Sequence, residues 1–441
     1  MARIQKVHAR EVLDSRGNPT VEVEVHCNDG SFGRAIVPSG ASTGQREACE
    51  LRDGDPARYD GRGVLKAVAN VNRVLGPSLV ALDVEVENQA AIDTHIVCED
   101  DSEQKTKLGA NALLGISLAV AHAGAAAKRV PLYRHIETLF RDQDAINYPV
   151  ELALGVPAPP SPPFVPRMPL PMTNMISGGL HAGGNLDFQD FLILPVGAKR
   201  YSEGLEWIVR VYRRLGELLT NAGYEGRLVG DEGGYGPRLK SNAEAVEFVV
   251  RAVEAAKLRP GEDVAIALDV AASHFFDGES YRLSATGGAR LSSGEMIDEL
   301  ESLLNRFPIV SIEDGLAEND WGGWQDLTRR LGKRVRLVGD DLFVTNTMWL
   351  ENGIYDGMAN AVLIKVNQIG TLSETLRTMY VARRAGYLRV VSARSGETED
   401  TTIADLAVGT AAEQIKIGCI TRSERLAKYN RLLRIEEELE G

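Results

Sequence analysis

The sequence has few cysteines, and their spacing matches no known cysteine motif. Its four cysteines, Cys27, Cys49, Cys98 and Cys419, are scattered among 441 residues without a CxxC pair. This spacing does not suit a zinc site or a redox pair and indicates structural thiols in a reducing compartment. The first residues, MARIQKVHAREVLDSRG, also lack the continuous apolar core of a signal peptide. We therefore expect a cytoplasmic protein.

Positive charge is also scarce. The chain has 49 Lys and Arg against 62 Asp and Glu, a net charge of -13. Nucleic-acid phosphates would be repelled by such a surface, so we expect no nucleic-acid partner and only local basic sites. No GxGxxG follows an early strand pattern and no GxxxxGK[ST] occurs. Dinucleotide and P-loop chemistry therefore lose their main support.

One apolar segment, LGANALLGISLAVAHAGAAA at residues 108–127, has the length of a membrane span. It is dominated by Ala, Gly and Ser and contains Asn111 and His122. This composition favours burial against other helices over insertion into a bilayer. We expect no membrane association.

Residues 1–140 have the pattern of strands followed by helices. TVEVEV alternates strictly, as a half-buried antiparallel strand does. Helical periodicity follows in VLKAVANVNRVLGPSL and at residues 88–97. These features predict a small N-terminal α+β domain.

A proline-rich stretch at residues 141–170 follows and includes GVPAPPSPPFVPRMP. Proline interrupts helices and sheet hydrogen bonding, so this stretch is predicted to be a linker or an extended insertion. A ligand for a proline-recognising partner domain is the alternative.

From residue 171 to 441, apolar runs alternate with amphipathic helical stretches. The eight strand candidates are FLILPV, RLVGDE, AIALD, IVSIED, RLVGDD, AVLIKV, RVVSA and QIKIG. Eight such units predict an eight-stranded β/α barrel, in which catalytic groups lie at the carboxyl ends of the strands. A doubly wound open sheet is the alternative fold.

Several of these runs end abruptly in charged residues, which a barrel would bring to one rim: Asp231, Glu232, Asp269, Glu313, Asp340, Lys365 and Arg394. Asp269, Glu313 and Asp340 each end a different predicted strand, and no His or Cys accompanies them. Three such carboxylates are hard oxygen ligands that suit Mg²⁺ or Mn²⁺.

Two lysines, Lys365 and Lys416, also lie in these strand patterns. A lysine beside a divalent cation has its ammonium form disfavoured, so its pKa can fall far enough for it to act as a base. The second lysine could hold a substrate carboxylate, and Glu232 could protonate a leaving hydroxyl. Together these groups predict removal of a proton next to a carboxylate.

Three loops favour a phosphorylated substrate. SGASTG, at residues 39–44, is small enough to fold over a site, and Ser39 could offer an oxygen to metal or phosphate. His181 lies between glycines in GGLHAGG, as in a lid. Arg394 and Ser395, with the backbone at Gly396, could cradle a phosphate. We expect a small phosphorylated carboxylate.

The ordered motifs resemble the enolase (phosphopyruvate hydratase) family over nearly the whole chain. They include DSRGNPTVEVEV, VPSGASTG, GANALLGISLA, VGDEGG, SIEDG, GDDLFVTN, LIKVNQIGTLSE and SGETEDT. The resemblance implies an enolase-type barrel with two Mg²⁺ ions, one on Asp269, Glu313 and Asp340 and a second, substrate-linked ion on Ser39. A Lys base beside Mg²⁺ is general to this superfamily.

The same resemblance assigns further roles. It implies Lys365 as base, Glu232 as its acid partner, and a homodimer through the N-terminal domain, in which Glu22 and Arg434 match positions that pair across the interface. The remaining implied contacts are Lys416 on the carboxylate, Arg394 and Ser395 on the phosphate, and His181 and Gln189 closing on the substrate.

Two positions depart from the enolase pattern. Ala393 stands where enolases have a histidine, and Asp190 stands where they have a glutamate that belongs to the network around the departing hydroxyl. Losing a proton-transfer or orienting group typically lowers a rate by about 10² to 10⁴. A vacancy at Ala393 would leave room beside the phosphate and C3 of the substrate.

Three functions remain open on this basis. The first is a specialised enolase relative that resembles carboxyphosphonoenolpyruvate synthase of phosphonate and phosphinate antibiotic pathways and takes a phosphonylated co-substrate. The second is an ordinary glycolytic enolase that converts 2-phosphoglycerate to phosphoenolpyruvate and water. The third is a non-catalytic binding protein on an enolase scaffold, which retention of the charged residues disfavours.

Overall fold

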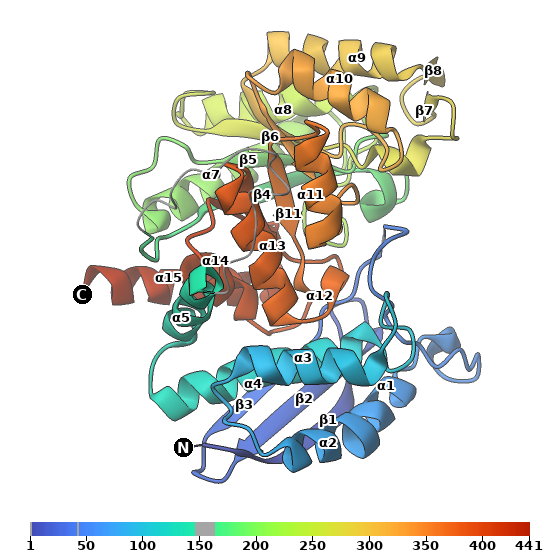
Figure 1. The fold of residues 1–441 in the computed structure, drawn as a ribbon. Coiled ribbons are helices and arrows are strands. Elements are labelled where there is room, and N and C mark those ends of the chain that lie inside the picture. The colour runs from blue at the N-terminus through green and yellow to red at the C-terminus, as the bar shows by residue number, and fades with distance from the viewer. Residues whose placement is uncertain (1, 42–43, 146–163) are drawn as a thin grey trace.

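A computed structural model describes residues 2–41, 44–145 and 164–441 (Figure 1). A small N-terminal domain with a three-stranded sheet lies beside a larger barrel domain. Much of the predicted proline-rich linker falls outside the described residues.

The N-terminal sheet is antiparallel and has the order β1 (Ile4–Leu13), β2 (Pro19–Cys27) and β3 (Phe32–Ile36). In β2, Val21, Val23 and Val25 are fully buried, which accounts for the alternating sequence. The predicted antiparallel strand is confirmed.

Helices cover one face of this sheet, and they include the segment with the length of a membrane span. α4 (Ala110–Lys128) packs on β2 and β3, and 83% of its most apolar window is buried inside the protein. A Cβ at Gly33 would lie 2.0 Å from the Ala119 carbonyl oxygen, so the close packing of α4 on β3 requires glycine there.

The other elements of the N-terminal domain are η1 (Tyr59–Gly61), α1 (Leu65–Asn70), η2 (Val71–Leu75), α2 (Gly76–Leu82), α3 (Gln89–Asp100) and α5 (Leu132–Ala145).

The larger domain is a closed eight-stranded barrel, as predicted. Its strands, in order around the barrel, are β4 (Leu170–Ser177), β5 (Asp190–Leu194), β6 (Ala265–Asp269), β9 (Ile309–Glu313), β10 (Arg336–Gly339), β11 (Ala361–Ile364), β12 (Leu388–Ser392) and β13 (Gln414–Gly418).

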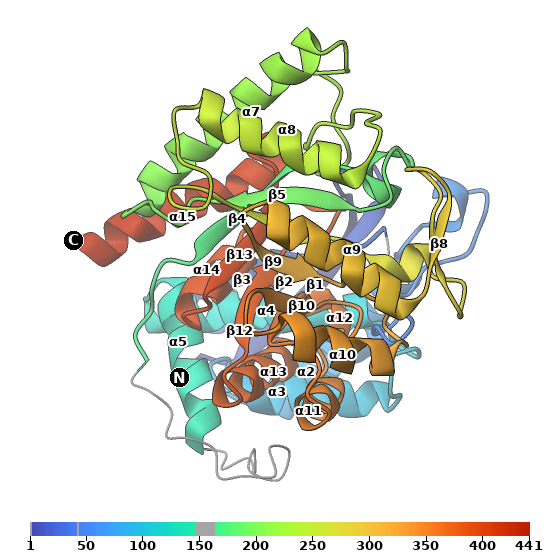
Figure 2. The same cartoon turned by 90° about the horizontal axis from the view of Figure 1, so that it is seen from above.

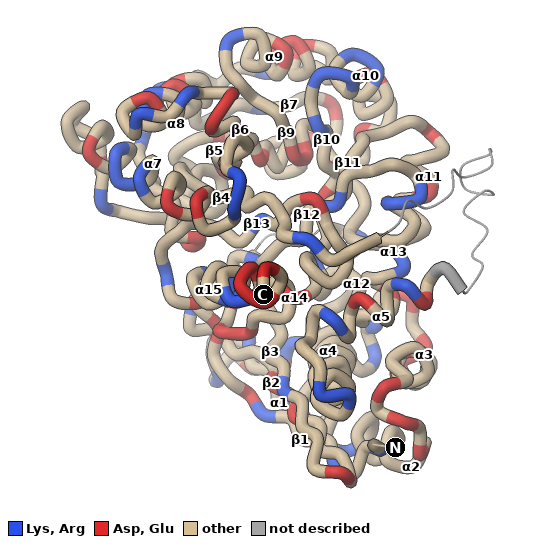
Figure 3. Tube along the Cα trace, turned by 90° about the vertical axis from the view of Figure 1, so that its left-hand side faces the viewer, with Lys and Arg blue, Asp and Glu red and all other residues tan. Residues whose placement is uncertain are grey.

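Helices surround the barrel, and Figure 2 shows them arranged around it. They are α7 (Tyr201–Asn221), α8 (Asn242–Ala255), α9 (Ser293–Arg306), α10 (Trp321–Leu331), α11 (Thr347–Tyr355), α12 (Val366–Ile369), α13 (Leu372–Arg384), α14 (Thr402–Gly409) and α15 (Ser423–Glu440). Shorter elements are η3 (Gly179–Ala182), η4 (Ala272–Phe275) and the hairpin of β7 (Tyr281–Leu283) and β8 (Ala289–Leu291). Acidic and basic residues are interspersed over the outer helices (Figure 3).

One predicted barrel strand is wrong. RLVGDE, residues 227–232, forms a turn with an isolated bridge between Val229 and Tyr235, and Leu228 is 64% exposed, so its apolar run does not enter the core. The strand β4 was not predicted, because proline in its sequence argues against a strand. Pro171 lies at the second position of β4, where its missing N–H is tolerated.

The strand directions also differ from a simple βα repeat. β5 runs antiparallel to both β4 and β6, whereas the other neighbouring pairs are parallel. The connection that carries His181 therefore joins the carboxyl end of β4 to the start of β5. Asp190, at that start, pairs in register with Asp269 at the end of β6, so both lie on one rim.

Candidate active site at the carboxyl rim of the barrel

Two of the predicted metal ligands meet at a buried lysine. Asp269 ends β6 and Glu313 ends β9, and the two residues are register partners. The Lys416 Nζ from β13 donates to Asp269 Oδ2 at 2.7 Å and to both Glu313 oxygens at 2.8 Å. Burial alone would lower the pKa of Lys416, but the two carboxylates raise it well above its usual value. Lys416 is therefore a fixed cation at the centre of the rim.

The third carboxylate, Asp340, follows β10 and pairs with Lys365, which follows β11. Gln368 Nε2 donates to the other Asp340 oxygen at 2.8 Å. Burial would lower the pKa of Lys365, but the charges of Asp340, Glu313 and Asp341 together raise it. The lower pKa predicted from the sequence applies to Lys365 beside a bound divalent cation, and it stays a prediction.

A further acid fixes the turn that carries Asp340. Asp314 accepts the backbone N–H groups of Asp340 and Asp341 on its two oxygens, at 2.9 Å each. Oxygens of these three residues lie within 4.8 Å of one another. Burial, followed by the charge of Asp340, raises the pKa of Asp341 to about 8. So many close carboxylates need positive charge nearby, which a metal ion could supply.

The three predicted ligands offer the donor atoms that a hard divalent cation prefers, although the cluster within 4.8 Å that contains Asp340 is completed by Asp314 and Asp341. Asp269, Glu313 and Asp340 are 2%, 2% and 8% exposed and offer only oxygen. In the described part of the chain, their countercharges are the ammonium groups of Lys416 and Lys365. An oxygen-only set with excess negative charge is typical of Mg²⁺ sites.

A second buried group lies at the start of β5. His181, Asp190 and Glu232 each place a polar atom within 4.8 Å of the others, and His181 Nδ1 lies 2.9 Å from Asp190 Oδ2. Asn174 donates to the other Asp190 oxygen. Gln189, the neighbour of Asp190, donates to Asp269 Oδ2 at 3.2 Å and joins this group to the first carboxylates.

Charges inside this group control its protonation. Burial would lower the pKa of His181, but Asp190 outweighs it and raises that pKa to about 9. Burial raises the pKa of Asp190 to about 6, against the opposing effect of His181. Burial would raise the pKa of Glu232, but His181 and then Arg425 keep it below its usual value. Near neutral pH His181 is thus an imidazolium between two carboxylates.

The predicted phosphate-binding residues lie where the two domains meet. Arg394 Nη1 donates to Glu47 at 3.1 Å and to Asn367 at 2.8 Å. Ser395 Oγ accepts from Arg16 Nη1 at 3.1 Å and from the Ala41 N–H at 2.9 Å. Segments of the N-terminal domain therefore complete this side of the rim.

Ser39 belongs to the same junction. Its backbone exchanges hydrogen bonds of 2.8 and 2.9 Å with Gly396. Its hydroxyl donates to Glu50 at 3.0 Å and accepts from Arg52 at 3.0 Å. The structure thus directs Ser39 Oγ to Glu50 and Arg52, and its role as a metal ligand stays a prediction.

The C-terminal helix α15 supports the turn after β12. Arg425 and Lys428 are almost fully buried, at 0% and 1% exposure. Arg425 donates to the carbonyl oxygens of Arg394 and Ser395, and Lys428 Nζ donates to Thr398 O at 2.7 Å. These cations hold the backbone of the predicted phosphate cradle in place.

Comparison with known protein families matches both domains. Residues 4–136 match the family model described as Enolase, N-terminal domain, and residues 166–441 match the one described as Enolase, C-terminal TIM barrel domain. The chain belongs to the enolase family. The rim described above is thus the carboxyl end of an enolase barrel, with the enolase N-terminal domain against it.

Ala393 is the distinctive position of this enolase site. It follows β12, is 6% exposed, and its N–H donates to the Lys416 carbonyl oxygen at 2.8 Å. Its methyl group packs within the main apolar core of the enolase domains. The position expected to carry an imidazole thus lies beside the strand that carries Lys416.

Some residues of the site were not predicted from the sequence. Glu47, Gln368, Arg16, Asp314 and Asn174 contact the predicted residues directly. Gln368 lies in the matching stretch LIKVNQIG, and Asp314 follows Glu313 directly, so both had a signal. Asp231 is exposed, and its N–H donates to the His181 carbonyl oxygen at 3.2 Å.

The predicted enolase dimer contacts stay a prediction. Glu22 pairs with Arg10 of its own chain on the neighbouring strand, and Arg434 is exposed on α15.

Proposed function

We propose that this enzyme removes the proton at C2 of 2-phosphoglycerate or a close analogue and forms an enolpyruvate product. The observation that carries the proposal is the pair of lysines in the carboxylate rim, Lys416 on Asp269 and Glu313 and Lys365 on Asp340. Both lysines contact carboxylates of the same rim, and Gln189 links Asp269 of this rim to the group of His181 and Asp190.

Each group has a defined task in this reaction. Lys365 Nζ, after losing the proton that Asp340 now stabilises, accepts the C2 proton. Lys416 and Arg394 bind the two anionic ends of the substrate, because both are buried cations. Glu232 takes a proton from the adjacent His181 imidazolium and passes it to the leaving hydroxyl.

A divalent metal fits this scheme. Asp269, Glu313 and Asp340 would hold Mg²⁺, and Ser39 is the candidate contact of a second ion. The bound charge would stabilise the dianion that forms when a carboxylate-bearing carbon loses its proton.

We further propose that the enzyme is specialised, because Ala393 replaces an imidazole next to the strand of Lys416. Without that imidazole, hydration chemistry at C3 loses an orienting or proton-transferring group, and a bulkier or second substrate gains space. The co-substrate that we propose is phosphonylated, as in carboxyphosphonoenolpyruvate synthesis. The product would then be a phosphonate-bearing enolpyruvate.

Ordinary enolase activity is the second candidate. The observation that favours it is the intact His181–Asp190 ion pair beside Glu232, since these groups lie within 4.8 Å and can still move protons. A cytoplasmic homodimer would suit either candidate.

The deciding experiment compares two reactions of the purified enzyme with Mg²⁺. One contains 2-phosphoglycerate alone, followed by the absorbance of the enol product. The other adds an activated phosphonoformate, with products identified by phosphorus NMR. We expect slow turnover alone and a new phosphonate-bearing enolpyruvate with the co-substrate. Robust phosphoenolpyruvate formation from 2-phosphoglycerate alone would contradict the specialised role, and no proton exchange at C2 in either reaction would contradict both.

A further inference from the structure

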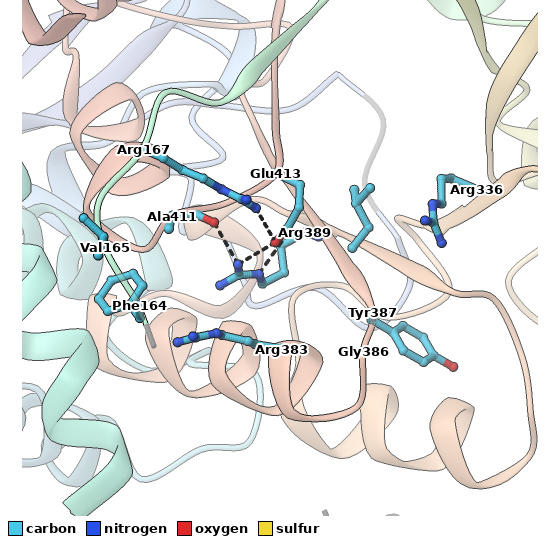
Figure 4. A pocket seen from close by; sticks show the side chains of 11 residues that line it. Phe164, Val165, Arg167, Arg336, Arg383, Gly386, Tyr387, Arg389, Ala411 and Glu413 are labelled. Atoms are coloured by element: carbon cyan, nitrogen blue, oxygen red, sulfur yellow. Dashed lines mark hydrogen bonds and ion pairs between the residues drawn. The ribbon is translucent and has the colours of Figure 1, made fainter. Parts of the chain in front are cut away.

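A cavity lies at the end of the barrel opposite the active-site rim. Its volume is about 430 Å³. Arg336 at the start of β10 and Leu388 at the start of β12 line it, so it lies where these parallel strands begin. Phe164, Val165 and Arg167, shortly before β4, form another wall, as Figure 4 shows.

The cavity is strongly basic in an acidic protein. Among the described residues that line it are four arginines, Arg167, Arg336, Arg383 and Arg389, and one acid, Glu413. The lining thus carries a formal charge of +3, although the chain as a whole carries -13. Such a local excess of guanidinium groups attracts anions and binds carboxylate and phosphoryl oxygens in a planar geometry.

Two of the arginines share the single acid. Arg389 is 2% exposed and donates through Nη2 to Glu413 Oε1 at 2.8 Å, and Arg167 Nη2 donates to the same oxygen at 3.0 Å. Arg389 also donates to the carbonyl oxygens of Thr410 and Ala411. Burial would raise the pKa of Glu413, but Arg389 keeps it low, so this acid stays ionised.

Arg383 and Arg336 line the other side of the cavity. The Arg383 guanidinium carbon lies 5.1 Å from the centre of the Phe164 ring, which supports its position. Arg336 lies across the cavity from these groups in Figure 4. Among the described residues that line the cavity, the only carboxylate is already shared by Arg167 and Arg389.

We propose that this cavity binds a small multivalent anion that carries phosphoryl or carboxylate groups. The volume is in the range of small-molecule sites, about 300 to 1,000 Å³. Phe164, Tyr387 and Leu388 line part of the wall and suit an apolar portion of such a ligand. The site is separate from the active-site rim, because β12 runs from Leu388 at the cavity to Ser392 at the rim.

The test uses isothermal titration calorimetry on the full chain without added metal, with pyrophosphate and citrate as separate probes at constant ionic strength. Arg336→Glu places a negative charge in the cavity, and because Arg336 is exposed the fold should tolerate it. The matched control is Arg329→Glu, which makes the same change at an exposed position of α10 outside the cavity. Melting temperatures confirm that both variants are folded.

We expect Arg336→Glu to weaken anion binding by about tenfold or more, as loss of a charge-assisted contact does, while Arg329→Glu changes it by less than about twofold. Pyrophosphate preference would indicate a phosphoryl ligand and citrate preference a polycarboxylate, and either supports the proposal. Equal effects of the two substitutions, no effect of Arg336→Glu, or no binding of either probe would overturn it.

Discussion

The two ends of the barrel carry opposite excesses of charge, although the same strands connect them. At the carboxyl rim, Asp269, Glu313 and Asp340 face two lysines, and at the opposite end four arginines face one glutamate. The groups also differ in kind. Lysine, histidine and carboxyl groups exchange protons near neutral pH when their surroundings shift them, whereas guanidinium groups stay charged.

The side chains at the rim suit proton transfer, whereas those at the opposite end suit binding of anions. The rim holds groups whose pKa values are displaced by burial and by one another, as proton transfer requires. The opposite cavity holds permanent charge, which suits recognition. Experiments that alter one end of the barrel and leave the other unchanged can therefore test this difference in role.

The largest effect should come from removal of divalent metal. Three buried carboxylates at the rim need a cation when substrate adds further negative charge, so chelation with EDTA should lower turnover by at least about 10⁴-fold. Adding Mg²⁺ back should restore it. Pyrophosphate binding, measured without metal, should be unaffected by prior chelation, and residual turnover in EDTA would contradict the proposed metal role.

Loss of the candidate base should have the next largest effect. Lys365→Ala removes the proposed proton acceptor and should lower turnover by about 10⁴-fold. Exchange of the C2 proton of 2-phosphoglycerate with deuterated water reports this step directly by NMR. Lys333→Ala, at an exposed position beyond α10, is the matched control and should stay within about twofold of wild type. Exchange that survives in Lys365→Ala would assign the base elsewhere.

Restoring the imidazole should have an intermediate effect. If the missing imidazole limits loss of the C3 hydroxyl, Ala393→His should raise formation of phosphoenolpyruvate from 2-phosphoglycerate by about 10- to 100-fold. The enlarged side chain should at the same time reduce use of the phosphonylated co-substrate. A wild type that already runs fast and does not respond to Ala393→His would show that the position has no catalytic meaning. The anion cavity should not respond to this change.

The smallest effect concerns protonation. Asp190 raises the pKa of His181 to about 9, so the ring is charged below that pH. Asp190→Asn removes the stabilising charge, and the pKa should fall toward the ordinary value, leaving a neutral ring at pH 8. NMR titration of the His181 ring protons measures this shift. Citrate binding at the arginine cavity should stay constant from about pH 7.5 to 9, because neither guanidinium groups nor the citrate carboxylates titrate there.

The sequence was sufficient for the class of fold and for much of the rim. Apolar runs that end in Asp269, Glu313 and Asp340 identified strand ends without help from tertiary structure, because barrel strands are continuous and buried. The same logic failed at residues 227–232, where Leu228 is exposed and the chain turns instead of forming a strand.

Other features depend on contacts that no local pattern encodes. Pro171 prevented the prediction of β4 from the sequence. The antiparallel direction of β5 depends on how the chain returns across the rim. Glu47 meets Arg394 only because the N-terminal domain packs on the barrel. The raised pKa of Lys365 depends on the carboxylate of Asp340, which only the fold brings beside it.

The last helix of the chain has a consequence for synthesis of the enzyme. Arg425 and Lys428 on α15 hold the backbone of residues 394–398, although every proposed catalytic side chain precedes them. Domains generally fold from the N-terminus as the chain leaves the ribosome. Here the barrel can gather its acids and lysines early, but the cradle beside Arg394 gains its supports only when α15 has emerged. A message truncated just before α15 would thus yield a chain that keeps the proposed catalytic side chains but lacks the supports of the cradle beside Arg394.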